Sequence, residues 1–251
     1  MVDKVSKSHG MTSDKASRVK TRGGRKEDIF AQLIKGLVLK GTKKQDVINS
    51  YEQHFSIKGG GEVKGGSGRQ GRIQVFMYNP SRFEKEKDFP AGSIIKSIFN
   101  CYPATYQEYQ SSKEEVKKKI AVCMQKLKEY LTNDTNRANF LDRAFFDRKV
   151  DFLVIYDDDI FHIFDKIEVW DILLKHLKVE NSSSNQKVVF KLDTICAEIE
   201  MRTTDDGKYP TIFMPLSKRI LFDLLTTNIK TKKELSNFLW LYGTAIKKYK
   251  S

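Results

Sequence analysis

The sequence predicts a mixed α/β fold, with a central mixed β-sheet flanked by helices. Three observations lead to this class. The nearly continuous apolar run from Val150 to Tyr156 is typical of a central strand buried on both faces. Residues Lys113 to Leu131 carry apolar side chains at helical spacing, and residues Arg72 to Tyr78 alternate as a strand does. Because such helical and strand patterns interleave along the chain, we expect helices packed around at least one sheet.

The N-terminal part begins with a basic arm, residues 1–24, which carries little apolar content. A helix is predicted to begin near Lys26 and to end at Gly41. A short helix or turn is expected from Lys44 to Tyr51, before a glycine-rich loop. The apolar face of the first helix is expected to contain Ile29, Leu33 and Leu37, with Phe30 and Ile34 beside them.

The remaining elements follow from periodicity and turn residues. Further strands are predicted at Ser93–Phe99, Ile160–Phe164, Val188–Leu192, Ile195–Arg202 and Thr211–Met214. A helix is predicted from Lys166 to Leu177, and two more helices should close the chain. Thr231 and Glu234 have the spacing of a capping box for the last helix.

The charge balance points to an anionic partner. The chain of 251 residues carries a net charge of +13 and has a pI near 9.5, which is common among nucleic-acid-binding proteins. No apolar run reaches the roughly 18 residues that span a bilayer, and the polar N-terminus does not resemble a secretory signal. Three dispersed cysteines suggest reduced thiols, so a cytoplasmic protein is expected.

The glycine-rich loop contains the tripeptide Glu62-Val63-Lys64, whose acid and lysine would project to the same side of a strand. Asp46 lies upstream, and Glu27 lies on the predicted first helix. Two carboxylates can hold Mg²⁺, and a lysine beside them can polarise a water molecule that attacks a phosphodiester. We therefore interpret Asp46, Glu62, Lys64 and Glu27 as candidate catalytic residues, with Asp46 and Glu62 as the metal ligands.

This arrangement resembles the PD-(D/E)xK nucleases, and type II restriction endonucleases in particular. That family uses an aspartate, a gap of variable length and then Glu-x-Lys, followed in several members by a stretch of small residues and a strand. The segment from Glu62 to Phe76 looks similar. The resemblance implies a restriction-endonuclease-like fold and Mg²⁺-dependent, sequence-specific cleavage of double-stranded DNA. It also implies a prokaryotic host with a cognate DNA methyltransferase, and a monomer or homodimer.

The same resemblance suggests how the chain is divided. Residues 25–135 are expected to form the catalytic region and residues 136–251 the DNA-recognition and C-terminal region, or one continuous domain with it. Basic and amide side chains on the arm and the loops would contact phosphates and base edges. The candidate DNA-binding residues are Arg22, Arg25, Lys58, Arg69, Gln70, Arg72, Arg202 and Lys208.

Three alternatives stay open. Glu198 and Glu200 place two acids on one strand face, and some restriction enzymes carry Glu-x-Glu in place of Glu-x-Lys. Alternatively, the basic loop could bind DNA or RNA without chemistry. A third possibility is a toxin that cleaves RNA.

Overall fold

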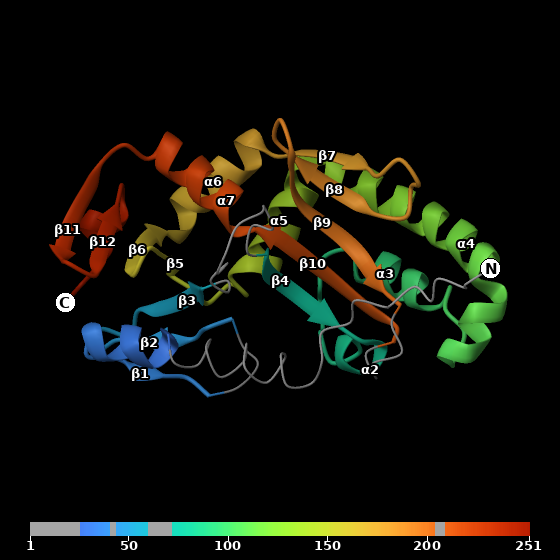
Figure 1. The fold of residues 1–251 in the computed structure, drawn as a ribbon, viewed down its shortest axis with the longest axis horizontal. Coiled ribbons are helices and arrows are strands. Elements are labelled where there is room, and N and C mark those ends of the chain that lie inside the picture. The colour runs from blue at the N-terminus through green and yellow to red at the C-terminus, as the bar shows by residue number, and fades with distance from the viewer. Residues whose placement is uncertain (1–25, 41–43, 60–71, 204–208) are drawn as a thin grey trace, which may run out of the picture.

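The computed structural model describes residues 26–40, 44–59, 72–203 and 209–251. Within these ranges the chain forms two β-sheets flanked by helices (Figure 1). The mixed α/β class expected from the sequence is therefore confirmed at this level.

The larger sheet of the described residues has seven strands in the order β1-β2-β3-β5-β6-β12-β11. The first three strands form an antiparallel meander, and β3 then pairs in parallel with β5. At the other end, β12 lies parallel to β6. The bounds are β1 Leu37–Val38, β2 Val47–Ile48, β3 His54–Lys58, β5 Phe152–Asp157, β6 Ile160–Asp165, β11 Lys232–Ser236 and β12 Leu239–Tyr242.

The smaller sheet has five described strands in the order β4-β10-β9-β8-β7, all antiparallel. Helix α4 packs on β7 and β8, and α5 packs on β4. The strand bounds are β4 Arg72–Tyr78, β7 Lys178–Asn181, β8 Val188–Lys191, β9 Ile195–Arg202 and β10 Thr211–Ser217.

Residues 26–33 form the first described helix. Helix α4 begins at a capping box, in which Glu108 N donates to Thr105 Oγ1 at 3.2 Å. The other bounds are α2 Pro80–Phe83, α3 Gly92–Phe99, α4 Tyr106–Thr132, α5 Asp134–Phe145, α6 Lys166–His176, α7 Lys218–Asn228 and α8 Ala245–Lys248.

Strand β5 separates the two apolar clusters of the core. Leu153 and Ile155 belong to the larger cluster, which the smaller sheet and helices α4 to α7 share. Phe152 and Val154 point to the opposite face and join the cluster beneath residues 26–33. Because successive strand residues face opposite sides, a strand covered on both sides needs an unbroken apolar run. The prediction of a central buried strand here is confirmed.

The first helix differs from its prediction. It ends at residue 33 rather than at Gly41. Lys35 adopts a positive φ of 51° and turns the chain, and Gly36 then approaches β2 so closely that a Cβ there would lie 2.6 Å from the Ile48 carbonyl oxygen. The predicted apolar face is also partly wrong. Phe30 and Ile34 are buried, whereas Ile29, Leu33 and Leu37 are exposed by 40, 36 and 72%.

Two further element predictions are wrong, and a third is partly right. Where a helix or turn was expected at residues 44–51, the structure has strand β2 followed by a turn. The predicted strand Ser93–Phe99 belongs to helix α3, where Ile95, Ile98 and Phe99 are buried at helical spacing. The expected last helix with its capping box is strand β11, which pairs with β12 at the end of the larger sheet. Hydrogen bonding between strands outweighed the local capping signal there.

Both sheets combine strands from the two halves of the chain. Strand β4 pairs with β10, and β3 pairs with β5, so hydrogen bonds join residues on either side of position 135. Position 135 itself lies in α5. The segments around β2, β3 and β4 are thereby brought together at the junction of the two sheets.

Candidate functional site

Asp46 lies immediately before β2 and faces β3. Its backbone N–H donates to the Phe55 carbonyl oxygen at 2.8 Å, which continues the ladder between the two strands. Its carboxylate oxygen Oδ2 accepts hydrogen bonds from Ile57 N at 2.6 Å and from Ser56 Oγ at 3.4 Å. The carboxylate is therefore held in place over the end of β3.

Glu27 and Lys58 share the surroundings of Asp46. Burial raises the pKa of Asp46 above its usual range, while the Lys58 ammonium opposes that shift. Burial and the Asp46 carboxylate likewise raise the pKa of Glu27, and Lys58 again acts in the opposite direction. Thus two partly desolvated carboxylates, one from the helix and one from the residue before β2, lie near one lysine at the end of β3.

The sequence names Asp46 and Glu27 as candidate catalytic residues and Lys58 as a candidate for DNA binding, and the structure brings the three near one another. Ser56-Ile57-Lys58 has the spacing of acid-x-lysine on a strand, with a serine in place of the acid. A search that tolerated a neutral residue there would have found it. Seven other candidates lie outside the described residues: Arg22, Arg25, Glu62, Lys64, Arg69, Gln70 and Lys208.

The alternative acids on β9 are engaged in ion pairs. Lys187 Nζ lies 3.3 Å from Glu198 Oε1 and also pairs with Glu200. Arg72 Nη1 on β4 lies 3.3 Å from Glu198 Oε2. Arg202 is the last residue of β9, on the same sheet. Strand β9 therefore carries a network of paired charges between neighbouring strands.

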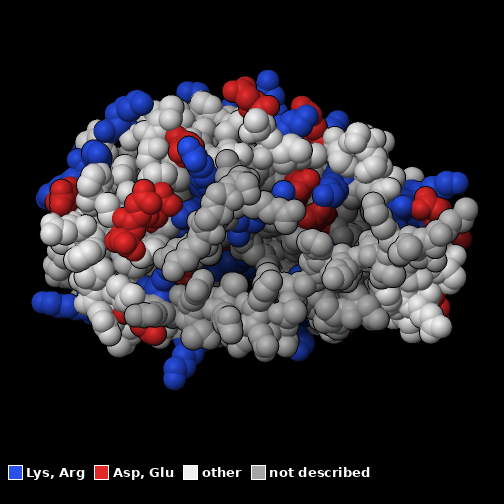
Figure 2. All heavy atoms as spheres, viewed as in Figure 1, with Lys and Arg blue, Asp and Glu red and all other residues white. Residues whose placement is uncertain are grey.

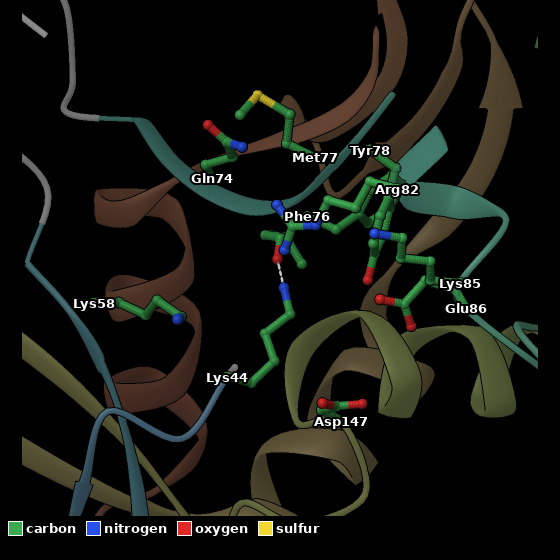
Figure 3. A pocket seen from close by; sticks show the side chains of 11 residues that line it. Lys44, Lys58, Gln74, Phe76, Met77, Tyr78, Arg82, Lys85, Glu86 and Asp147 are labelled. Carbon is green, nitrogen blue, oxygen red and sulfur yellow. Dashed lines mark hydrogen bonds between the residues drawn. The ribbon is translucent and has the colours of Figure 1, made fainter. Parts of the chain in front are cut away.

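A cleft of about 400 Å³ opens beside Lys58. Figure 3 shows Lys44 and Lys58 approaching it from the segments around β2 and β3, opposite Arg82 and Lys85. Strand β4 forms the wall between them, and the Lys44 ammonium donates to the Val75 carbonyl oxygen of this strand. Figure 2 shows lysine and arginine atoms deep in a hollow near the middle of this face.

Basic side chains outnumber acidic ones in the lining of the cleft. Lys44, Lys58, Arg82 and Lys85 contribute basic groups, whereas the acids of the lining are Glu86 and Asp147. Burial lowers the pKa of Lys44 to about 7, and the neighbouring Lys58 ammonium acts in the same direction. Such a cluster of basic groups attracts anions.

The residues around Asp46 could supply part of the coordination shell of a divalent cation, with the other ligands coming from water and substrate. Among the described residues, no group of three or more His, Cys, Asp or Glu side chains could hold a metal ion. Glu27 and Asp46 nevertheless supply two carboxylates, and burial followed by the nearby Asp46 charge raises the pKa of Glu27. Mg²⁺ commonly takes one or two carboxylates together with waters and substrate phosphate oxygens. The donor set therefore suits a magnesium ion that binds with its substrate.

Comparisons with protein families, curated proteins and solved structures gave no match for this chain. In the part of the chain that the structure describes, no helix combines the length and the apolar character needed to cross a membrane.

Proposed function

We propose that this protein is a Mg²⁺-dependent endonuclease that hydrolyses phosphodiester bonds in double-stranded DNA. The observation that carries the proposal is the convergence of Glu27, Asp46 and Lys58 at the edge of a basic cleft. These are the residue types that metal-assisted phosphodiester hydrolysis needs: acids for the cation and a lysine for the reacting oxygen or water.

The resemblance to PD-(D/E)xK nucleases extends to the order of these residues. Asp46 is followed, after a gap, by Ser56-Ile57-Lys58 on β3. Because residues 56 and 58 project to the same side of the strand, Lys58 stands where the family places its lysine relative to the acid. Ser56 is the departure, and Glu27 would supply the second carboxylate in its place.

Each residue has a defined task in this proposal. Glu27 and Asp46 would hold the cation, and the hydrogen bonds that Asp46 accepts from Ser56 and Ile57 would fix the position of one ligand. When bound, Mg²⁺ would lower the pKa of a coordinated water and neutralise charge on the phosphate. Lys58 would orient the attacking water and stabilise negative charge that develops on the phosphoryl oxygens. The basic cleft would hold the DNA strand beside these groups.

By the same resemblance, we propose the type II restriction class, with Mg²⁺ as cofactor and a cognate DNA methyltransferase as the partner that protects the host site. A digest of mixed-sequence duplex DNA with Mg²⁺ tests this class directly. Discrete fragments with mapped ends are expected, since a type II enzyme cuts at a short fixed sequence.

The site assignment is tested by single substitutions. Asp46→Asn, Glu27→Gln and Lys58→Ala should each reduce the cleavage rate by about 100-fold or more, because each removes charge stabilisation from the transition state. Asp28→Asn is the matched control, since Asp28 is the exposed neighbour of Glu27 on the same helix. It should cut at the rate of the unaltered protein.

Other outcomes separate the rival hypotheses. Full cleavage by Lys58→Ala together with loss in Lys64→Ala would move the site to Glu62 and Lys64. Loss only in Glu198→Gln or Glu200→Gln would move it to β9. Binding without cleavage in Mg²⁺ and Mn²⁺ would favour a non-catalytic binder, and preferential cleavage of RNA would favour a toxin; either result would overturn the proposal.

A further inference from the structure

The cleft beside Lys58 extends beyond the proposed metal site. Its far end is formed by α2 and the turn that follows, which contribute Arg82, Lys85 and Glu86 to the lining. Its near end is formed by Lys44 and Lys58. Lys58 therefore belongs both to the site around Asp46 and to the cleft. A ligand in the cleft would lie next to Lys58 (Figure 3).

The two acids in the lining share one partner from within the protein. Arg143 on α5 pairs with Glu86 through one guanidinium nitrogen and with Asp147 through another. Arg143 does not itself line the cleft. It offsets part of the negative charge of the two acids, so the basic groups of the lining outweigh the acids at this cleft.

Basic groups line the cleft from two sides. Lys44 and Lys58 lie at its near end, where the Lys44 ammonium donates to the Val75 backbone carbonyl, and Arg82 and Lys85 lie opposite them. An anion between the two sides would gain charge–charge attraction in a partly enclosed space. A phosphodiester group, with one negative charge and two unbridged oxygens, suits lysine and arginine donors from two sides.

We propose that this cleft binds a second phosphate of the same DNA strand, next to the phosphate that reacts at Asp46 and Lys58. The inference rests on the proposed function, because it assigns the cleft to the backbone of the same substrate. The bound phosphate would fix the register of the strand, so that the reacting phosphate meets Lys58 in one position.

The test uses two exposed lysines that are two residues apart. Lys85 lines the cleft, whereas Lys87 does not, and both side chains lie on the surface. Binding of a short duplex to the full chain, without divalent metal, is measured by fluorescence anisotropy at several salt concentrations. Lys85→Gln should weaken binding at low salt and reduce the slope of log K against log salt by about 0.9, the loss of one phosphate contact.

Two controls make the result specific. Lys87→Gln should keep the slope of the unaltered protein, and Lys85→Arg should keep it because arginine also binds phosphate. Equal slopes for Lys85→Gln and the unaltered protein would overturn the inference, as would an equal loss in Lys87→Gln.

The same samples separate this inference from the proposed function. A chain that shows the expected change of slope but never cuts the duplex with Mg²⁺ would overturn the endonuclease and support the phosphate site. A chain that cuts normally while Lys85→Gln leaves the slope unchanged would overturn only the phosphate site.

Discussion

At the scale of single residues, Ser56 shows how the neighbourhood of Asp46 limits what a strand position can carry. Its side chain is fully buried, and its hydroxyl donates to the Asp46 carboxylate. An acid at this position would place another charge beside a carboxylate whose pKa burial already raises. On the proposed function, Glu27 supplies the second acid from the helix, where the side chain is only partly buried.

His162 provides a prediction that is independent of catalysis. Burial lowers its pKa from 6.5 to about 4, although Asp157 and Asp158 favour the charged form and Lys218 opposes it. The ring packs against Phe222, with centroids 4.6 Å apart, and Nδ1 shares a hydrogen bond of 2.9 Å with the Tyr242 hydroxyl. The folded protein therefore holds a neutral imidazole.

Because the unfolded chain binds this proton more readily, stability is fully present above pH 6.5 and is lost as the pH falls toward 4. Urea unfolding across this interval should show that the unaltered protein loses about 2–3 kcal/mol more than His162→Phe. Parallel pH profiles for the two proteins would contradict the assignment of a neutral buried histidine.

At the scale of elements, Gly243 joins β12 to α8 and allows a close approach by α6. Its φ is +53°, and a Cβ there would lie 2.3 Å from Glu168 Oε2, which accepts a hydrogen bond from Thr244 N at 2.9 Å. Gly243→Ala should lower the free energy of unfolding by roughly 2 kcal/mol, through backbone strain and the displaced carboxylate.

Gly92→Ala is the matched control for this change. Gly92 is the first residue of α3, and a Cβ there would meet nothing within 4 Å. Alanine should therefore be neutral or slightly stabilising at that position. Chemical denaturation of both variants measures the difference. Equal losses in the free energy of unfolding would show that the close approach of Glu168 to Gly243 does not account for the effect.

The elements also show which signals in the sequence could be interpreted. Strand β5 and helix α4 were predictable because each carries its burial pattern along its own length. Strand β11 was not predictable, because all its residues are exposed and its conformation depends on pairing with β12. Of the proposed site, Asp46 and Glu27 were candidates from the sequence alone, whereas the role proposed for Lys58 depends on strands brought together in space.

At the scale of the whole molecule, the C-terminal residues contact the sheet that carries the proposed site. Strand β12 joins this sheet beside β6, and the chain then returns to the turn between β2 and β3. Gln53 Nε2 donates to the Lys248 carbonyl oxygen at 2.8 Å, and Asn49 Nδ2 donates to that of Lys250 at 3.0 Å. The last residues therefore support the strands next to Asp46 and Lys58.

Tyr249 makes the apolar contacts between the C-terminal residues and this sheet. Its ring centroid lies 6.2 Å from that of Phe55 on β3 and 6.3 Å from that of Phe152 on β5, both in edge-on contact. Tyr249→Ala should lower the free energy of unfolding by about 1–2 kcal/mol, through lost apolar burial and ring contacts. It should also speed hydrogen exchange at the β3 amides, which lie beside the proposed site.

Phe238→Ala is the control for Tyr249→Ala, because Phe238 is an aromatic residue in the turn between β11 and β12 whose side chain is about half exposed. This variant should change neither the free energy of unfolding by more than about 0.5 kcal/mol nor the exchange of β3 amides. If both variants sped exchange in β3 equally, the effect would reflect general loosening of the sheet, and the C-terminus would have no specific role in supporting Asp46 and Lys58.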